Sequence, residues 1–336
     1  MNWSELGALL GRSRRVLLMA HVSPDGDTVG STLGLAWALR ARRLEARVAC
    51  AEPLPSDLLF LPGSGEFSAR GLDGEDLVLA IDASDPARLG NLYDGLARAG
   101  VPVVNMDHHA TNTRFGTLNL VGERAATAEL ALEAILALDL PLTAPAAQCL
   151  LTGLVSDTRG FRITDTTADT LRAAARLVEA GASLVQVNDA LFNRVPPATL
   201  GVWGAALAQA QLDDGLLWTY LSHEVLSRAP GESSITKNLT NFLSTIDEAR
   251  CAALFKELGD GVIDVSLRSR PGLDVSGIAL ALGGGGHARA AGCLVPGTLV
   301  DVQAQVLAML RMEMRRMAML RPSMQSSADP AELGQA

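Results

Sequence analysis

Cysteine is scarce in this sequence, with four residues in 336 and no C-x-x-C pair. The four are Cys50, Cys149, Cys251 and Cys293. This spacing argues against a disulfide framework and against a zinc cluster built from cysteines. Reduced thiols are the simpler interpretation, and we therefore predict a cytoplasmic location.

Positive charge is also scarce, since 28 Lys and Arg stand against 37 Asp and Glu for a net charge of −9. Binding to long duplex DNA or RNA rests on many basic contacts to phosphates, so this balance argues against such a partner. A short anionic ligand, held by a few local groups or metals, remains compatible with it. No apolar run approaches the roughly 18 residues of a membrane span, and the first residues lack a signal-peptide pattern, so we expect no membrane partner.

Apolar residues, by contrast, make up 48% of the chain, enough for substantial cores, and 336 residues suggest two domains. In the first half, short apolar runs alternate with helical patterns. Strands are expected at 16–20, 46–51, 77–81 and 101–106. Helices are expected at 28–42, 86–99, 127–138, 145–155 and 167–180. This alternation predicts an α/β domain over 1–185, with a parallel sheet covered on both faces.

The composition changes in the second half. Residues 186–205, which contain the N-R-V-P-P segment, are predicted as a linker. A smaller α+β domain is predicted over 206–320, with a glycine-rich loop. Its expected strands are 215–221, 249–255 and 262–268, and its expected helices are 274–282 and 299–320. The polar residues 321–336 are predicted to be a disordered tail.

Four of the five histidines stand in dense polar or glycine-rich segments that follow apolar runs. The first such segment begins at His21, directly after the first expected strand, and contains Asp25 and Asp27 in a Pro-Asp-Gly turn. One imidazole and two carboxylates at this spacing can converge on a cation. The alternative is a polar turn that caps the following helix.

Three more polar segments share this character. Asp82 follows the strand at 77–81, where an Asx turn or cap is the alternative. Asp107, His108 and His109 follow the strand at 101–106, and imidazole with carboxylate suits Mn, Fe, Co or Zn; a surface loop is the alternative. Asp157 ends an apolar helix, where a carboxylate is unfavourable for the helix dipole and a bound cation would explain it.

These segments are expected to converge, because ligands in open parallel sheets bind beyond the carboxyl ends of the strands. Five carboxylates and three imidazoles gathered without a metal would be electrostatically prohibitive at neutral pH. Two divalent cations would neutralise much of this charge. A pair of metals about 3.5–4 Å apart is the usual arrangement for activating water against a phosphoester.

A fifth segment lies in the second domain, where Gly283 to Gly286 precede His287. Four glycines let backbone N–H groups approach an anion, and we expect the start of a following helix to add its dipole. His287 can donate to a phosphoryl oxygen. Nearby, Arg268 can bind phosphate in bidentate fashion. A flexible loop and a solvated strand end are the respective alternatives.

The motifs H-x-x-P-D-G-D-x-x-G-S, a strand-end Asp, D-H-H, S-D-T and G-G-G-H-x-x-A-A-G follow one another between His21 and Gly292. In this order they resemble the DHH phosphoesterases that carry a DHH-associated C-terminal domain. The two-domain length looks most like the nanoRNase and pAp phosphatase group, where pAp is a 3′,5′-bisphosphonucleoside. The resemblance implies a manganese-dependent hydrolase with a parallel-sheet DHH domain and a smaller α+β domain.

Site residues are carried over by position from the same resemblance. His21, Asp25 and Asp82 would hold one metal. A second metal would be held by Asp27, Asp82, His108 and Asp157, with Asp82 bridging the two. Asp107 would orient its neighbours, and His109 would contact the scissile phosphate or donate a proton, so that His109, Asp107 and Asp82 form the catalytic group. Substrate contacts would come from the second domain, through His287, Gly284, Gly285, Gly286, Arg268 and Ser269.

The leading hypothesis is a two-metal phosphoesterase that cleaves short single-stranded RNA oligonucleotides to mononucleotides and pAp to AMP. A phosphodiesterase acting on cyclic or linear dinucleotides is the main rival. A non-catalytic nucleotide-binding regulatory module is the alternative from another class, and an incomplete ligand set would be its signature. The methionine-rich stretch at 309–319 reads as an amphipathic helix, which suggests a possible homodimer.

Overall fold

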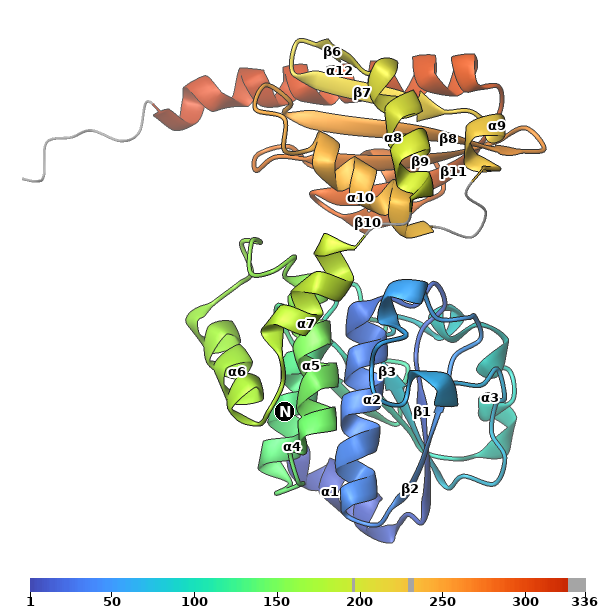
Figure 1. Ribbon diagram of the computed structural model, residues 1–336, viewed down its shortest axis with the longest axis vertical. Coiled ribbons are helices and arrows are strands. Elements are labelled where there is room, and N and C mark those ends of the chain that lie inside the picture. The colour runs from blue at the N-terminus through green and yellow to red at the C-terminus, as the bar shows by residue number, and fades with distance from the viewer. Residues whose placement is uncertain (195–196, 229–232, 326–336) are drawn as a thin grey trace, which may run out of the picture. The chain divides into compact units, whose positions relative to one another are not determined.

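The computed structural model describes residues 1–194, 197–228 and 233–325, which form two compact units that divide after Arg194 (Figure 1). The first unit contains a five-stranded sheet in the order β2-β1-β3-β4-β5, and every neighbouring pair is parallel. Its strands are β1 (Arg15–Met19), β2 (Glu45–Ala49), β3 (Leu77–Ile81), β4 (Val103–Asp107) and β5 (Leu118–Val121). The predicted parallel α/β domain is confirmed, although β5 is not anticipated by the sequence.

Successive side chains of these strands enter two different cores. Val16 and Leu18 of β1 pack into the larger core, whereas Leu17 and Met19 pack into the smaller one on the opposite face. Both faces are therefore dry, which explains why the strands read as continuous apolar runs rather than as alternating patterns.

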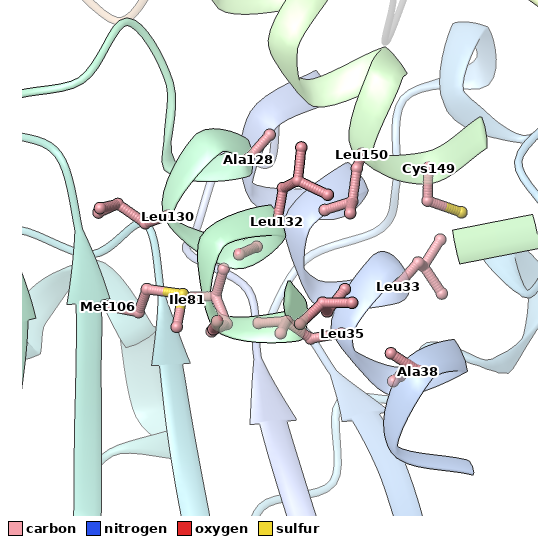
Figure 2. Close-up of a cluster of buried hydrophobic side chains, with 14 of the residues drawn as sticks. Leu33, Leu35, Ala38, Ile81, Met106, Ala128, Leu130, Leu132, Cys149 and Leu150 are labelled. Atoms are coloured by element: carbon pink, nitrogen blue, oxygen red, sulfur yellow. The ribbon is translucent and has the colours of Figure 1, made fainter. Parts of the chain in front are cut away.

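Helices cover both faces of this sheet. The larger core is formed with α1 (Trp3–Arg12), α2 (Gly26–Ala41), α4 (Thr127–Ala137), α5 (Ala144–Asp157), α6 (Ala168–Glu179) and α7 (Leu184–Asn188). Figure 2 shows side chains of α2, α4 and α5 meeting beside Ile81 and Met106, near the ends of β3 and β4. This packing holds the beginnings of α2 and α4 close to the carboxyl edge of the sheet.

The single helix predicted at 86–99 is wrong. The chain forms a 3-10 segment, η3 (Pro86–Leu92), and a short helix, α3 (Leu96–Ala99). Gly90 interrupts the helical conformation at φ 60° and ψ −150°. A Cβ at Gly90 would lie 2.9 Å from Val22 Cγ1, so the break allows η3 to pack closely on the loop after β1. Short 3-10 segments η1 (Ser56–Leu58) and η2 (Ser64–Glu66) lie between β2 and β3.

The second unit has a six-stranded mixed sheet in the order β10-β11-β9-β8-β7-β6, in which only β7 and β8 pair in parallel. The strands are β6 (Gln211–Asp213), β7 (Leu216–Leu221), β8 (Cys251–Gly259), β9 (Val262–Ser269), β10 (Gly285–His287) and β11 (Ala290–Pro296). The helices are α8 (Ala198–Ala208), α9 (His223–Leu226), α10 (Ser233–Leu243), α11 (Ser276–Ala281) and α12 (Leu299–Gln325). The predicted α+β architecture is confirmed.

Strand β8 divides its side chains between two cores. Ala253 and Phe255 face the core built with α11 and α12, while Ala252 and Leu254 face the core built with α8 and α10. Helix α12 continues to Gln325, five residues into the segment predicted as a tail, and residues 326–336 lie outside the described part of the chain.

The glycine run does not precede a helix, which corrects the expectation of a helix dipole there. Gly285 to His287 form β10, which pairs antiparallel with β11. A Cβ on Gly284 would lie 2.1 Å from the carbonyl oxygen of Gly292, and one on Gly286 would lie 2.5 Å from that of Ala290. These two glycines are therefore required by the close approach of β10 to β11.

Helices also occupy most of the stretch 186–205 that is predicted as a linker. Among its described residues are the end of α7, all of η4 (Asp189–Asn193) and most of α8. No helix within the described ranges is long and apolar enough to cross a membrane.

Candidate metal centre

The polar residues singled out in the sequence follow three neighbouring strands. β1, β3 and β4 are adjacent in the sheet, and their carboxyl ends lead to His21, Asp82 and the pair His108 and His109. Parallel strands end at the same edge, so these side chains gather there. The strand order of the sheet thus places one carboxylate and three imidazoles at the same edge.

Helix α2 begins at this same edge, and Asp25 is its N-cap. The Asp25 Oδ1 atom accepts hydrogen bonds from the backbone N–H groups of Asp27 at 3.1 Å and Thr28 at 3.2 Å. The alternative read from the sequence, a polar turn that caps the helix, is therefore present, and Asp25 is the cap. The same oxygen lies 3.8 Å from His21 Nε2.

Asp157 reaches the site through a close contact between α2 and α5. A Cβ on Gly30 would lie 2.4 Å from the carbonyl oxygen of Cys149, and one on Gly26 would lie 2.5 Å from Ser156 Cβ. Only glycine permits this separation of the two helices. As the last residue of α5, Asp157 is thereby brought beside the first turn of α2.

The six expected metal ligands, together with His109, fall into three groups, and in each group the candidate ligand atoms lie within 4.8 Å of one another. The groups are His21, Asp25 and Asp82; Asp27, His108 and Asp157; and Asp82, His108 and His109. The first two match the two expected ligand sets, apart from the shared Asp82.

Asp82 lies between the two expected sets. Its Oδ2 is 3.4 Å from His21 Nε2, and its Oδ1 is 3.7 Å from His108 Nε2. His108 Nε2 is also 3.2 Å from Asp157 Oδ2. Each carboxylate oxygen of Asp82 therefore faces a different group, which is the arrangement that a bridging ligand requires.

The backbone at Asp82 is unusual, with φ at 60° in the left-handed region. Its N–H donates to the carbonyl of Met106 at 2.8 Å, so the turn is anchored to β4. A non-glycine residue at positive φ costs of order 1–3 kcal/mol, and such strain concentrates at functional sites. The turn directs the Asp82 carboxylate across the edge of the sheet.

Asp27 is fully buried and is held by three donors. Its Oδ1 accepts from Ser31 Oγ at 3.0 Å and from the N–H of Ala128 at 2.9 Å, while its Oδ2 accepts from the N–H of Thr127 at 2.6 Å. Two of these donors are backbone groups in the first turn of α4. Helix α4 thus supports the site without contributing a ligand.

Without a bound cation, burial and mutual repulsion disfavour the ionised forms of the carboxylates in this cluster. Burial raises the pKa of Asp27 well above its usual range, and the nearby charges of Asp82 and Asp157 add to this. Burial also raises the pKa of Asp157, although its hydrogen bond with His108 acts in the opposite direction. Burial by itself would lower the pKa of His108, but Asp157 and Asp82 raise it well above its usual range.

This donor set fits divalent cations. Buried carboxylates with raised pKa values gain stability when a cation replaces the proton, and carboxylate with imidazole suits Mn, Fe, Co or Zn. The orientation of the His108 ring is also fixed by a hydrogen bond on the side away from the cluster, because its Nδ1 lies 3.0 Å from the carbonyl oxygen of Arg124. Such a bond fixes the tautomer that leaves Nε2 as the ligand atom.

His109 forms its short contact with Asp107 and not with a member of the two expected ligand sets. Its Nδ1 lies 2.7 Å from Asp107 Oδ1 and 3.7 Å from Asp82 Oδ1. Burial would raise the pKa of Asp107, but the hydrogen bonds from His109 and Asn112 lower it. Asp107 therefore stays ionised and orients the His109 ring.

Three supporting residues escape the sequence analysis. Thr127 Oγ1 donates to Asp82 Oδ1 at 2.7 Å, Asn112 Nδ2 donates to Asp107 Oδ2 at 2.6 Å, and Arg88 Nη2 lies 3.2 Å from His21 Nδ1. Only Asn112 carries a local signal, because it stands three residues after the D-H-H motif. Arg88 follows Asp82 by six residues but is not singled out by the sequence, and Thr127 comes from a segment with no polar motif around it.

In the second unit, the strand register brings two expected substrate residues into one row. His287 is opposite Ala290, and Ala290 is opposite Arg268 on the next strand. Directly opposed residues point to the same face, so His287 and Arg268 share a face with only the small Ala290 between them. Arg268 Nε donates to Asn241 Oδ1 at 3.0 Å, and Ser269 Oγ donates to the carbonyl of Leu273 at 2.6 Å.

Comparison with known proteins decides the family. Residues 15–154 match the DHH family, N-terminal domain, and residues 221–315 match the DHHA1 domain. The bifunctional oligoribonuclease and PAP phosphatase NrnA of Thermus thermophilus is 35% identical, over 90% of this chain and 90% of its own length. The chain belongs to the DHH family. All the site residues predicted from the resemblance except Asp157 lie within these two matched ranges.

Further relatives agree. The bifunctional oligoribonuclease and PAP phosphatase NrnA of Bacillus subtilis is 29% identical, over 83% of this DHH chain and 89% of its own length. A crystal structure of an exopolyphosphatase-related protein from Bacteroides fragilis superposes with a TM-score of 0.85 at 21% identity, covering 95% of this chain and 97% of the other. The latter likeness supports the fold.

Proposed function

We propose that this DHH-family chain is a two-metal phosphoesterase that hydrolyses short RNA oligonucleotides to mononucleotides and pAp to AMP. The observation that carries the proposal is the position of Asp82, which lies 3.4 Å from His21 and 3.7 Å from His108, each a member of a separate ligand group. The substrate assignment is supported by the two bacterial relatives, whose names state oligoribonuclease and PAP phosphatase activity.

Two divalent cations would be held by the two ligand groups. His21, Asp25 and Asp82 would hold one cation. Asp27, Asp82, His108 and Asp157 would hold the other. When bound, such a pair supplies an activated water and stabilises the charge that develops on the phosphoryl group. Manganese is our choice, since it accepts both carboxylate and imidazole ligands.

His109 would supply the proton for the leaving oxygen. Burial lowers its pKa, but the hydrogen bond to Asp107 and the charge of Asp82 raise it above the ordinary value. A larger fraction of the ring is then protonated near neutral pH. With Nδ1 held by Asp107, Nε2 is the nitrogen that can donate, and general acid catalysis of this kind contributes about 10²–10⁴-fold.

The second unit would supply substrate contacts through His287, Arg268, Ser269 and the glycines of β10. Arg268 is always charged, and its planar guanidinium matches a phosphate. Among the glycines, Gly285 has nothing within 4 Å of the position that a Cβ would occupy, so there is space for a ligand against its Cα. Gly284 and Gly286 have the packing role described above and would act by shaping the hairpin.

The proposal is tested by measuring mononucleotide release from dinucleotides to pentanucleotides, and AMP release from pAp, with Mn²⁺. Asp82→Asn and His108→Ala should each lower kcat by at least about 10–100-fold, because each removes a proposed metal ligand and loss of a partner that only orients a ligand already costs that much. Glu45→Gln is the matched control, since Glu45 is exposed and begins β2 at the opposite end of the sheet. Unchanged turnover in either site variant would refute the mechanism.

Substrate comparison separates the rivals. Linear dinucleotides, a cyclic dinucleotide and pAp are assayed at equal concentration. A preference for the cyclic dinucleotide would replace the proposed substrate while retaining the site. Calorimetry that detects no bound divalent ion would instead favour a nucleotide-binding regulatory module.

We also propose a cytoplasmic location and a homodimer. The four cysteines are free thiols and all are buried, which suits a reducing compartment. Helix α12 carries exposed Met312 and Met319 on its outer side, which favours association. Light scattering of the purified chain tests the dimer directly.

A further inference from the structure

Arg88 is a positive charge placed beside a cluster that would bind positive ions. Its Nη2 lies 3.2 Å from His21 Nδ1, on the opposite edge of the imidazole from Asp25 and Asp82. Among the described residues, no carboxylate lies within ion-pair distance of Arg88. A positively charged guanidinium beside His21 would repel a bound cation, so holding the metals does not explain why Arg88 is there.

The contact between Arg88 and His21 is not a hydrogen bond. His21 Nε2 faces the carboxylates of Asp25 and Asp82. His21 Nδ1 lies 2.7 Å from the carbonyl oxygen of Val22, and because a carbonyl oxygen can only accept, Nδ1 carries a proton and donates to it. Arg88 Nη2 and His21 Nδ1 are then two donors facing each other, and they form no hydrogen bond.

The backbone nevertheless holds Arg88 in place. The N–H of Val22 donates to the carbonyl of Arg88 at 2.7 Å, which ties the loop after β1 to η3. Asp85 caps η3 by accepting from the N–H of Ala87 at 2.9 Å. The close packing of Gly90 on Val22 completes this attachment. The backbone of Arg88 is therefore fixed beside the loop that carries His21, and its guanidinium is placed where it can bind an anion.

We propose that Arg88 binds a second, non-scissile phosphate of the substrate. Its guanidinium is separated from the cation positions by the width of the His21 ring, so it is suited to a phosphate adjacent to the one undergoing hydrolysis. A 3′,5′-bisphosphate nucleotide and an oligonucleotide with a terminal phosphate both present such a group. This inference rests on the proposed function and adds a specificity residue to it.

The test compares pAp with a dinucleotide that has one phosphodiester and a 5′-hydroxyl. In Arg88→Gln, the ratio of kcat/KM for pAp to that for the dinucleotide should fall by about 10- to 100-fold, as expected for a lost charge-assisted hydrogen bond, with the change mainly in KM. Arg88→Lys should recover part of the ratio, because lysine keeps the charge but loses the planar fork. Arg12→Gln, which removes an exposed guanidinium at the end of α1, should leave the ratio unchanged.

Two results would overturn this inference. An equal loss on both substrates, or a loss on neither, would show that Arg88 does not recognise the second phosphate. A fall in Mn²⁺ affinity of Arg88→Gln by the same factor as its loss on pAp would show that Arg88 acts through His21. An unchanged Mn²⁺ affinity, measured by calorimetry, is the expected result.

A failure of the proposed function is recognised separately. If the native chain hydrolyses neither substrate, the proposed activity is wrong, and pAp can then be titrated without being consumed. Binding of pAp to the Mn²⁺-loaded chain should still weaken by about 10- to 100-fold in Arg88→Gln. Equal binding by the two proteins would refute the role of Arg88.

Discussion

The Thr127 hydroxyl donates a hydrogen bond of 2.7 Å to Asp82 Oδ1, joining the first residue of α4 to the carboxylate shared by both ligand groups. Both residues are buried. The bond fixes the direction of one Asp82 oxygen while leaving the second to face His21. It therefore orients the carboxylate that we propose to bridge the two cations.

Thr127→Val should weaken metal binding. The substitution keeps the branched shape but removes the donor, and loss of a partner that orients a metal ligand costs about 10–100-fold in metal affinity or activity. Mn²⁺ titration by calorimetry measures the effect. Thr127→Ser keeps the hydroxyl and is the control, and similar affinities for Val and Ser variants would show that the bond does not matter.

Gly30→Ala should damage both fold and site. The added methyl would lie 2.4 Å from the Cys149 carbonyl oxygen, forcing α2 and α5 apart. Overpacking of this kind lowers the free energy of unfolding by about 1–3 kcal/mol. Because the contact also carries Asp157, Mn²⁺ affinity should fall together with stability in denaturant titrations.

Gly11→Ala is the matched control for that change. Gly11 lies in α1 and has nothing within 4 Å of its Cβ position. Alanine is a better helix former by about 0.5–1 kcal/mol, so this variant should be as stable as the native chain or more so. Equal effects at the two positions would contradict the close helix contact.

The metal-free protein should lose stability as pH rises through the neutral range. The pKa values of His21, His108 and His109 are raised, each against the opposing effect of burial, by neighbouring carboxylates. A group whose pKa is raised on folding contributes stability below its unfolded value, near 6.5 for histidine, and loses it as pH rises through the folded value. The raised pKa values of Asp27 and Asp157 act in the same direction.

Saturating Mn²⁺ should reverse this trend, because the cation needs the deprotonated ligands. Thermal unfolding with and without a chelator, from pH 6 to 9, measures both effects. The stabilisation by metal should grow with pH and should disappear in Asp157→Asn. A metal-free melting temperature that rises with pH would be inconsistent with the crowded carboxylates.

Alanine substitutions at Gly284 and Gly285 should have different effects on the melting temperature. Gly284→Ala places a Cβ 2.1 Å from the Gly292 carbonyl oxygen, whereas Gly285→Ala meets nothing within 4 Å. The first substitution should lower the melting temperature by several degrees, as a loss of about 1–3 kcal/mol implies. The second should leave the melting temperature unchanged and, if this backbone contacts substrate, raise KM.

Much of the site can be predicted from the sequence because most of its residues fall in short polar segments that directly follow apolar runs. His21, Asp25 and Asp27 fall within seven residues, and Asp82 and His108 each follow an apolar run that reads as a buried strand. The rule that parallel strands end at one edge then brings the segments together. Asp157 is signalled by the S-D-T motif of the resemblance and, apart from that, only as an unfavourable carboxylate at a helix end.

The remaining features depend on contacts that no local pattern encodes. Thr127 reaches Asp82 across 45 positions of the chain, and Arg88 reaches His21 across 67. The glycine run suggests a loop before a helix, but residues 285–287 form a strand because they pair with β11, and no local pattern predicts this pairing. The helix predicted at 86–99 fails for a similar reason, because the fit of Gly90 against Val22 outweighs the helical pattern.

Asp25 combines a helix-capping role with a proposed metal-ligand role. The oxygen that caps α2 is the same oxygen that faces His21. Ordering of this helix terminus and the proposed binding of a cation are thus energetically linked, and a bound cation should slow local fraying of the first turn. Hydrogen exchange at the amides of Asp27 and Thr28 should therefore slow when a cation occupies the proposed site of His21, Asp25 and Asp82. This measurement needs no substrate.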